Sequence, residues 1–360
     1  MKQHLRIGIL TLPALIMPLA HPAAARGDSP LAPDFLLQDA AIIIESAGVS
    51  EPDQQEVILQ LLHDYDAQCE ARRDMLDQAI RAAPQQGSEA GVVLGPLAAT
   101  RAYLAQKAED TQWLTDSLQL ILTEAQLEGF EQALRTISRR RGLPQVEPPI
   151  GQIDLAELLR SRWQEDRDRW TPQVREILAR WELDIAKSLA DLESFDVSKG
   201  VPFRVMVQQE DWEGALAWRE TWLKHHLGIR DLTRAAAMNL LPHLSDADAA
   251  FIEQEVVYGG RTFNSRTARL AGEAIERAAT SADAQQARDI LRQFQAEAEP
   301  TRRALIEAQL AAEGLQHLAP LQRRLGRPSK WEQMQQRQVE LLTTLRAIDD
   351  RWADQLKPAG

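Results

Sequence analysis

The chain has 360 residues, of which 44% are hydrophobic, and a formal net charge of −12 at pH 7. This length is enough for two or three domains, and the apolar content is sufficient for a packed core. Proteins that bind nucleic acid normally present a basic face, so the acidic balance argues against that class. The single cysteine, Cys69, excludes an internal disulfide, and packing must therefore stabilise the fold.

The first residues form the pattern of a secretory signal peptide. Lys2 and Arg6 supply positive charge, and an uncharged apolar run follows at residues 7–20. That run is too short for a membrane-spanning helix, and the alanines at 23–25 fit an A-x-A cleavage site. We expect residues 1–25 to be removed on export to the periplasm or the extracellular space, with no transmembrane anchor elsewhere. The mature net charge would be −14, because residues 1–25 carry two positive charges and no acid.

Beyond the signal peptide, apolar residues recur at helical spacing, and no clear strand is present. One pattern, apolar-x-x-apolar-apolar-x-x-aromatic-polar, starts at Ile58, recurs 116 residues later at Val174, and recurs 113 residues further on at Ala287. It describes a long amphipathic helix that occurs three times. Cys69 falls on an apolar position of the first copy, so we expect it in the core. The third copy contains Pro300, which should kink or break its helix.

These patterns predict an all-α fold of about eight to ten helices, arranged as long antiparallel hairpins or a bundle. We expect three related helical modules, at residues 26–150, 151–265 and 266–360. Residues 203–207 fit either a short strand or a continuing helix. Clusters of Gly, Pro, Ser and Asn predict loops at residues 84–96, 142–151, 196–202, 257–265 and 326–329.

The stretch Leu122-Thr123-Glu124-Ala125-Gln126 is typical of a helix start. Thr123 fits the N-cap position, and the Gln126 side chain, three residues later, can bond back to the Thr123 amide as in a capping box. Leu122 and Leu127 occupy the positions of a hydrophobic staple. Loss of the cap in Thr123→Ala should cost about 1 kcal/mol of stability, and we expect Gln126→Ala to cost less.

Two arginine runs, at residues 139–141 and 323–324, stand just before Gly and Pro at predicted helix ends. Cations are stabilised by the helix dipole at a C-terminus. We expect this structural role for both runs, in preference to phosphate or membrane binding.

The helix start at Leu122 also carries a family resemblance. Leu122-Thr123-x-x-Gln126, in an exported helical chain, resembles the motif of the LTxxQ periplasmic proteins. That family includes small helical envelope-stress adaptors and chaperones, which form cradle-shaped dimers. Leu244-Ser245-x-x-Asp248 is a degraded second match. The resemblance implies a helical interaction protein that forms a homodimer, and it assigns no functional residue in this chain.

No residue pattern for catalysis or cofactor binding is present in the sequence. The five histidines after residue 25 include no H-x-x-x-H or E-x-x-H pair, and one cysteine cannot form a thiolate zinc site. A nucleophile elbow and a phosphate-binding loop are also missing. We therefore expect no metal, no cofactor and no enzyme activity.

Tryptophan is abundant, with nine residues against three tyrosines. Trp218 and Trp222 are four residues apart and share a helix face, which His226 continues. Core packing between long helices explains such a face. The alternative is an aromatic groove for an extended polypeptide or a glycan, and it makes Trp218, Trp222 and His226 the candidate partner-binding residues.

Together these features predict an exported, non-enzymatic interaction protein, such as a periplasmic chaperone, adaptor or stress sensor. Its acidic surface would attract a basic or apolar protein partner or an unfolded client. A structural or scaffold component of the cell envelope is the alternative.

Overall fold

The computed structural model describes residues 33–82, 89–145, 152–163, 166–259, 265–278 and 280–356. This part of the chain is all-α and contains no strand, which confirms the predicted fold class. It has twelve α-helices, more than expected, because several short helices separate the long ones. Their bounds are α1 (Asp39–Ala47), α2 (Pro52–Ala82), α3 (Glu89–Ile121), α4 (Glu124–Gly142), α5 (Leu155–Trp163), α6 (Pro172–Gln208), α7 (Trp212–Leu240), α8 (Asp246–Ile252), α9 (Arg266–Arg277), α10 (Ser281–Ala312), α11 (Ala319–Arg324) and α12 (Lys330–Gln355).

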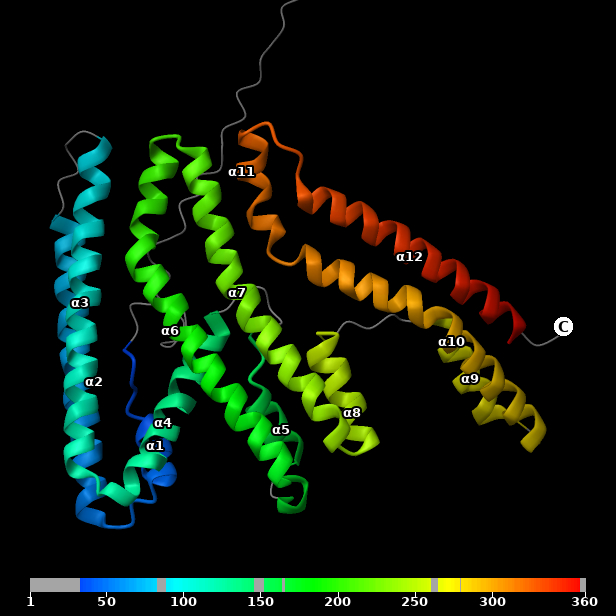
Figure 1. Cartoon of the computed structure of the whole chain (residues 1–360), viewed down its shortest axis with the longest axis horizontal. Coiled ribbons are helices and arrows are strands. Elements are labelled where there is room, and N and C mark those ends of the chain that lie inside the picture. The colour runs from blue at the N-terminus through cyan, green and yellow to red at the C-terminus, as the bar shows by residue number, and fades with distance from the viewer. Residues whose placement is uncertain are drawn as a thin grey trace, which may run out of the picture.

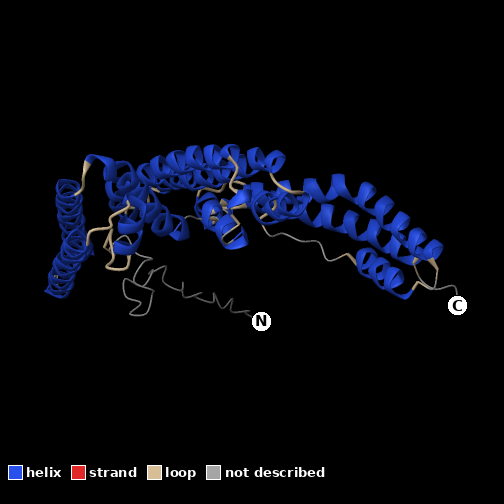
Figure 2. Cartoon of the chain, turned by 90° about the horizontal axis from the view of Figure 1, so that it is seen from below, coloured by secondary structure: helices blue, strands red, loops and turns tan. Residues whose placement is uncertain are grey.

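Three antiparallel pairs of long helices follow one another along the long axis of the molecule (Figure 1). The pairs are α2 with α3, α6 with α7, and α10 with α12. A short helix (α1, α5 or α9) precedes the first long helix of each pair. Seen from below, the array is extended and shallowly curved (Figure 2). Within the described residues, no helix combines the length and the apolar character that a bilayer crossing requires.

The repeated sequence pattern forms the buried stripe on the first helix of each pair. Its aromatic position holds Tyr65, Trp181 and Phe294, which are exposed by 0, 2 and 5%. In the first two pairs this ring also makes a polar contact with the partner helix. Tyr65 Oη lies 2.9 Å from Thr111 Oγ1, and Trp181 Nε1 donates to Thr233 Oγ1 at 3.3 Å. The next apolar position is buried in all three copies and holds Cys69, Ile185 and Ala298.

Two predicted loops are helical. Helix α6 runs without interruption through residues 196–202, and α3 begins at Glu89, so residues 89–96 of the loop predicted at 84–96 are helical. Helix α10 continues through Pro300, so the helix does not break there. Packing explains the first case, because Trp218 of α7 contacts both Phe195 and Phe203, on either side of the segment, at centroid distances of 5.2 and 4.4 Å. These contacts override the weak helix propensity of the residues between them. Residues 203–207 are accordingly helical, and the loop predicted at 326–329 lies between α11 and α12.

The first and second hairpins are joined by Arg139, near the end of α4. Its side chain is 2% exposed, and it donates from Nε to Asp154 at 2.8 Å and from Nη1 to Glu182 at 2.7 Å. The guanidinium also lies over the Trp181 ring, 5.6 Å from its centroid. Asp154 in turn accepts a hydrogen bond from the Glu157 amide at the start of α5. This arginine therefore connects three helices, a role beyond the helix-dipole contact that the sequence suggested.

A second buried arginine joins the second and third hairpins. Arg230 of α7 is 7% exposed, donates to the Leu310 carbonyl at 2.8 Å and pairs with Glu313 at 3.2 Å. Leu310 and Ile306, near the end of α10, belong to the apolar core around α6 and α7. Both junctions therefore combine apolar contact with a buried, paired guanidinium.

We predict that Arg139→Leu lowers the free energy of unfolding by about 3–5 kcal/mol, because it leaves the Asp154 and Glu182 carboxylates without their cation. The neighbouring Arg140 is a matched control: its side chain is 44% exposed and pairs with Glu157 at the surface. Arg140→Leu should cost less than about 1 kcal/mol. Urea unfolding followed by circular dichroism measures both values, and equal losses would show that Arg139 does not hold the junction.

Candidate functional site

Trp218 lies between α6 and α7. Its ring is half-buried against Phe195 and Phe203, and its indole N–H is buried with no hydrogen-bond acceptor among the described residues. Both rings that it contacts belong to α6. Trp218 therefore packs the second hairpin together along the segment that the sequence had placed in a loop.

Trp222 and His226 lie together, where α7 meets the short helix η6 (Leu315–His317). The half-buried Trp222 ring is centred 4.0 Å from His226 and 5.6 Å from His317. His226 is only 2% exposed. Arg219 lies over Trp222 at 4.5 Å and over Trp218 at 5.9 Å, so it connects the two aromatic contacts. The predicted residues thus share one helix face, but that face is covered in large part by α6 and η6.

Titratable groups in this region are shifted toward their neutral forms. Burial lowers the pKa of His226 to about 4, and the neighbouring His225, Arg219 and His317 add to the shift. On α6, desolvation raises the pKa of the partly exposed Asp196 to about 6 against the opposing effect of Arg219. Removal from water disfavours the charged form of both groups, almost completely at His226 and only in part at Asp196.

The Trp218 and Trp222 rings are half-buried and His226 is almost fully buried, and partner binding at these three residues stays a prediction. Sequence reasoning found the α7 residues from their spacing. It missed Phe195, Phe203 and His317, because contacts between distant helices leave no local pattern. Replacing both tryptophans by alanine would remove packing and binding area together, so this double variant separates the two roles poorly.

The predicted helix start at Leu122 forms a second candidate region, at the corner where α3 gives way to α4. The capping box is present: the Thr123 amide donates to Gln126 Oε1 at 2.9 Å. Gln126 also exchanges hydrogen bonds with Gln54 at the start of α2, at 2.9 and 3.2 Å. Gln54 Nε2 lies 2.8 Å from the Ile121 carbonyl. Gln126 therefore caps α4 and also ties it to α2.

Negative charge is also concentrated at this corner. Residues 51–71 of the α1–α2 connection and α2, together with residues 108–134 of α3 and α4, contain twelve Asp and Glu and no Lys or Arg. We call these two segments the acidic corner; they meet at the lower left of Figure 1. Large apolar side chains are exposed there, including Val57 at 44%, Trp113 at 42% and Leu120 at 86%. The sequence analysis missed the acidic corner because it summed charge over the whole chain.

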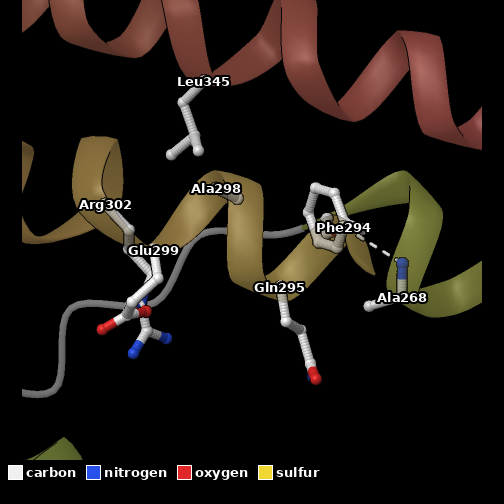
Figure 3. Close-up of a pocket in the computed structure, with 8 residues that line it drawn as sticks. Ala268, Phe294, Gln295, Ala298, Glu299, Arg302 and Leu345 are labelled. Carbon is white, nitrogen blue, oxygen red and sulfur yellow. Dashed lines mark hydrogen bonds and ion pairs between the residues drawn. The ribbon is translucent and has the colours of Figure 1, made fainter. Parts of the chain in front are cut away.

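A pocket of about 260 Å³ lies in the third hairpin, between α9, α10 and α12. Leu345 points from α12 toward α10, whereas Gln295, Glu299 and Arg302 extend from the other side of α10 (Figure 3). Arg302 and Glu299 already pair with each other at 3.0 Å. The pocket is small for a ligand site, and it gathers none of the candidate residues.

Comparisons with known protein families, with characterised proteins and with solved structures find no match for this chain. Within the described residues, no group of three or more His, Cys, Asp or Glu side chains is placed to hold a metal ion. The acidic corner and the aromatic face of α7 are therefore the two regions from which a function can be argued.

The double role of Gln126 reverses the order of effects expected from the sequence. Gln126→Ala removes the bonds to Thr123 and to Gln54, and we predict a loss of about 1–2 kcal/mol. Thr123→Ala should cost about 1 kcal/mol or less, since Thr123 is exposed and only its cap is lost. Gln126→Glu keeps the acceptor for the Thr123 amide but removes the amide donor to Gln54. Thermal melts of the three variants would contradict this reading if Thr123→Ala were the most harmful.

We predict that His226 makes the fold less stable as the pH falls from about 6.5 toward 4. The pKa of His226 is about 4 in the folded protein and 6.5 in the unfolded chain, so the unfolded chain takes up a proton first as the pH falls. The stabilisation is fully present above pH 6.5, and about 2 kcal/mol of it should be lost between pH 7 and pH 5. In His226→Leu that part of the pH dependence should disappear, whereas the exposed His243→Leu should retain it. Urea unfolding at both pH values provides the test, and identical profiles for the two variants would contradict it.

Proposed function

We propose that the protein is an exported, non-enzymatic helical interaction protein, of the periplasmic chaperone, adaptor or stress-sensor type. The observation that carries this proposal is the exposure of large apolar side chains on all three hairpins of a strongly acidic chain. They are exposed by 42–86% and comprise Val57, Leu59, Met75, Trp113, Leu120, Leu183, Met238 and Val339. Such side chains provide short-range binding energy, and the negative charge attracts basic or partly unfolded partners over longer distances.

The sequence features support the same proposal. The pattern of residues 1–25 favours export, and the stretch from Leu122 to Gln126 resembles the LTxxQ motif of periplasmic helical proteins. The extended array of hairpins gives a large surface for its mass, which suits transient contact with an unfolded chain. The same extended shape also suits a scaffold component of the cell envelope, the alternative function (Figure 1).

An aggregation assay without ATP tests the chaperone proposal. We predict that equimolar mature protein slows the aggregation of a basic unfolded client at 0.1 M salt, and has less effect on an acidic client of similar size. At 1 M salt the effect should weaken, because the Debye length falls from about 10 Å to about 3 Å. No effect on either client at either salt concentration, together with stable retention in an envelope fraction, would instead favour the scaffold function.

A further inference from the structure

We propose that the outer face of the acidic corner binds a basic amphipathic segment of a partner protein. The proposal rests on the proposed function, in that it assumes an interaction protein, and it names the surface and the chemistry of the partner. It is carried by the arrangement of exposed apolar and acidic side chains on α2 and α3.

On α3, four side chains form one exposed stripe. Glu109, Trp113, Asp116 and Leu120 are separated by four, three and four residues, so they share one face of the helix. All four are exposed, with Trp113 at 42% and Leu120 at 86%. A stripe that alternates acid and large apolar side chains is therefore open to solvent along about 16 Å of the helix.

On α2, a matching stripe contains Asp53, Val57 and Asp64, at spacings of four and seven residues, with Leu61 beside them. Val57 is 44% exposed and Leu61 is half-buried. Asp53 is exposed, and the Asp64 side chain is 48% exposed. This stripe also combines an apolar centre with carboxylates.

The two stripes lie on the same side of the hairpin. The bond from Gln54 Nε2 to the Ile121 carbonyl places the start of α2 beside the end of α3, and Arg72 pairs with Asp110 further along the same side. In a pair of antiparallel helices, side chains on both helices that are rotated in the same direction away from the line of contact point to the same face of the pair. The opposite face is covered near Thr111, whose Oγ1 donates to Asp34 at 2.7 Å. Apolar groups thus meet at the centre of the open face, and carboxylates line its edges.

Charge complementarity identifies the occupant. A basic amphipathic helix would place its apolar side chains on Val57, Trp113 and Leu120, and its Lys and Arg side chains beside the carboxylates at the edges. The acidic corner contains no Lys or Arg of its own, although Arg72 pairs with Asp110 and Arg135 with Glu131 at its boundary. A second copy of this chain would bring two such faces together and would be repelled by their like charge. An anionic lipid surface would be repelled for the same reason.

The test uses the mature protein and a fluorescent 18-residue helical peptide with Leu on one face and Lys on the other. Fluorescence anisotropy at low salt should show binding, whereas a scrambled peptide of the same composition and a Glu-for-Lys peptide should bind at least about tenfold more weakly. The variant with Trp113→Ala and Leu120→Ala should lose about tenfold or more in affinity, because it removes the apolar centre.

Exposed apolar residues on the other hairpins provide a matched control. Met238 and Val339 are 57 and 63% exposed, on α7 and α12. Met238→Ala with Val339→Ala should change the affinity for the peptide by less than about twofold. Circular dichroism melts should show both double variants folded, since Leu120, Met238 and Val339 are more than half exposed and Trp113 is 42% exposed.

A second pair of variants tests the charge. Neutralising the edges with Asp53→Asn, Asp64→Asn, Glu109→Gln and Asp116→Asn should weaken peptide binding about tenfold or more at low salt and flatten its salt dependence. Neutralising two exposed acids outside the acidic corner, with Glu276→Gln on α9 and Glu340→Gln on α12, should leave both the affinity and its salt dependence nearly unchanged.

Three outcomes would overturn the proposal. The peptide could bind the wild type and the Trp113/Leu120 variant with equal affinity, or the matched control variants could lose as much affinity as the variants of the acidic corner. The third is a wild-type protein that sediments as a dimer while the Trp113/Leu120 variant sediments as a monomer. The last would make a second copy the occupant. Failure of the proposed function is distinguishable, because it would appear as wild-type protein that binds the peptide but protects no client. A Trp113/Leu120 variant that still protects the basic client fully would leave the proposed function intact and refute this surface.

Discussion

Two long antiparallel helices cannot enclose a core, because each buries only one stripe against the other. The rest of this structure depends on that constraint, since every hairpin has to be completed by a neighbour. Two arginines, Arg139 and Arg230, occupy the points where this happens and are almost fully buried. Removing a guanidinium from water is costly unless carboxylates and carbonyls replace the water. Asp154 and Glu182 do so at the first junction, and Glu313 and the Leu310 carbonyl do so at the second. Because these partners have fixed directions, each guanidinium also defines how one hairpin is set against the next.

The buried side of each hairpin could be predicted well from the sequence. The repeated pattern located the stripe of α2, α6 and α10, and its aromatic and following apolar positions are buried in all three copies, including Cys69. This works because burial on an amphipathic helix follows a period set by the helix itself. Contacts between helices have no such period. The role of Arg139 and the continuity of α6 through residues 196–202 depend on side chains 15 or more residues away in the sequence. Local residue types were therefore insufficient to predict the role of Arg139, and they predicted a loop where α6 continues.

The candidate site on α7 was likewise predictable within its own helix but not in its contacts with other helices. Spacing correctly placed Trp222 beside His226 on one face of α7, with Trp218 one turn away. It could not show that Phe195, Phe203 and His317 cover much of that face, because these residues come from other helices. The acidic corner was hidden for another reason. Its two segments are far apart in the sequence, and the antiparallel packing of α2 on α3, with α4 tied to α2 through Gln54 and Gln126, brings them together.

Charged side chains have opposite effects on stability at the two junctions and at the acidic corner. At the junctions, buried cations are matched by carboxylates, and the pairing contributes to the fold. At the acidic corner, acids outnumber the cations at its boundary, and the repulsion between the excess carboxylates lowers the stability of the free protein. Added salt screens the repulsion and so stabilises the free corner, but it also weakens attraction to a basic partner. A bound basic segment would relieve the same repulsion and cover the exposed apolar side chains, so binding and folding would be thermodynamically linked at this corner. Under the proposed binding, the corner would be less stable alone than when a basic segment occupies it.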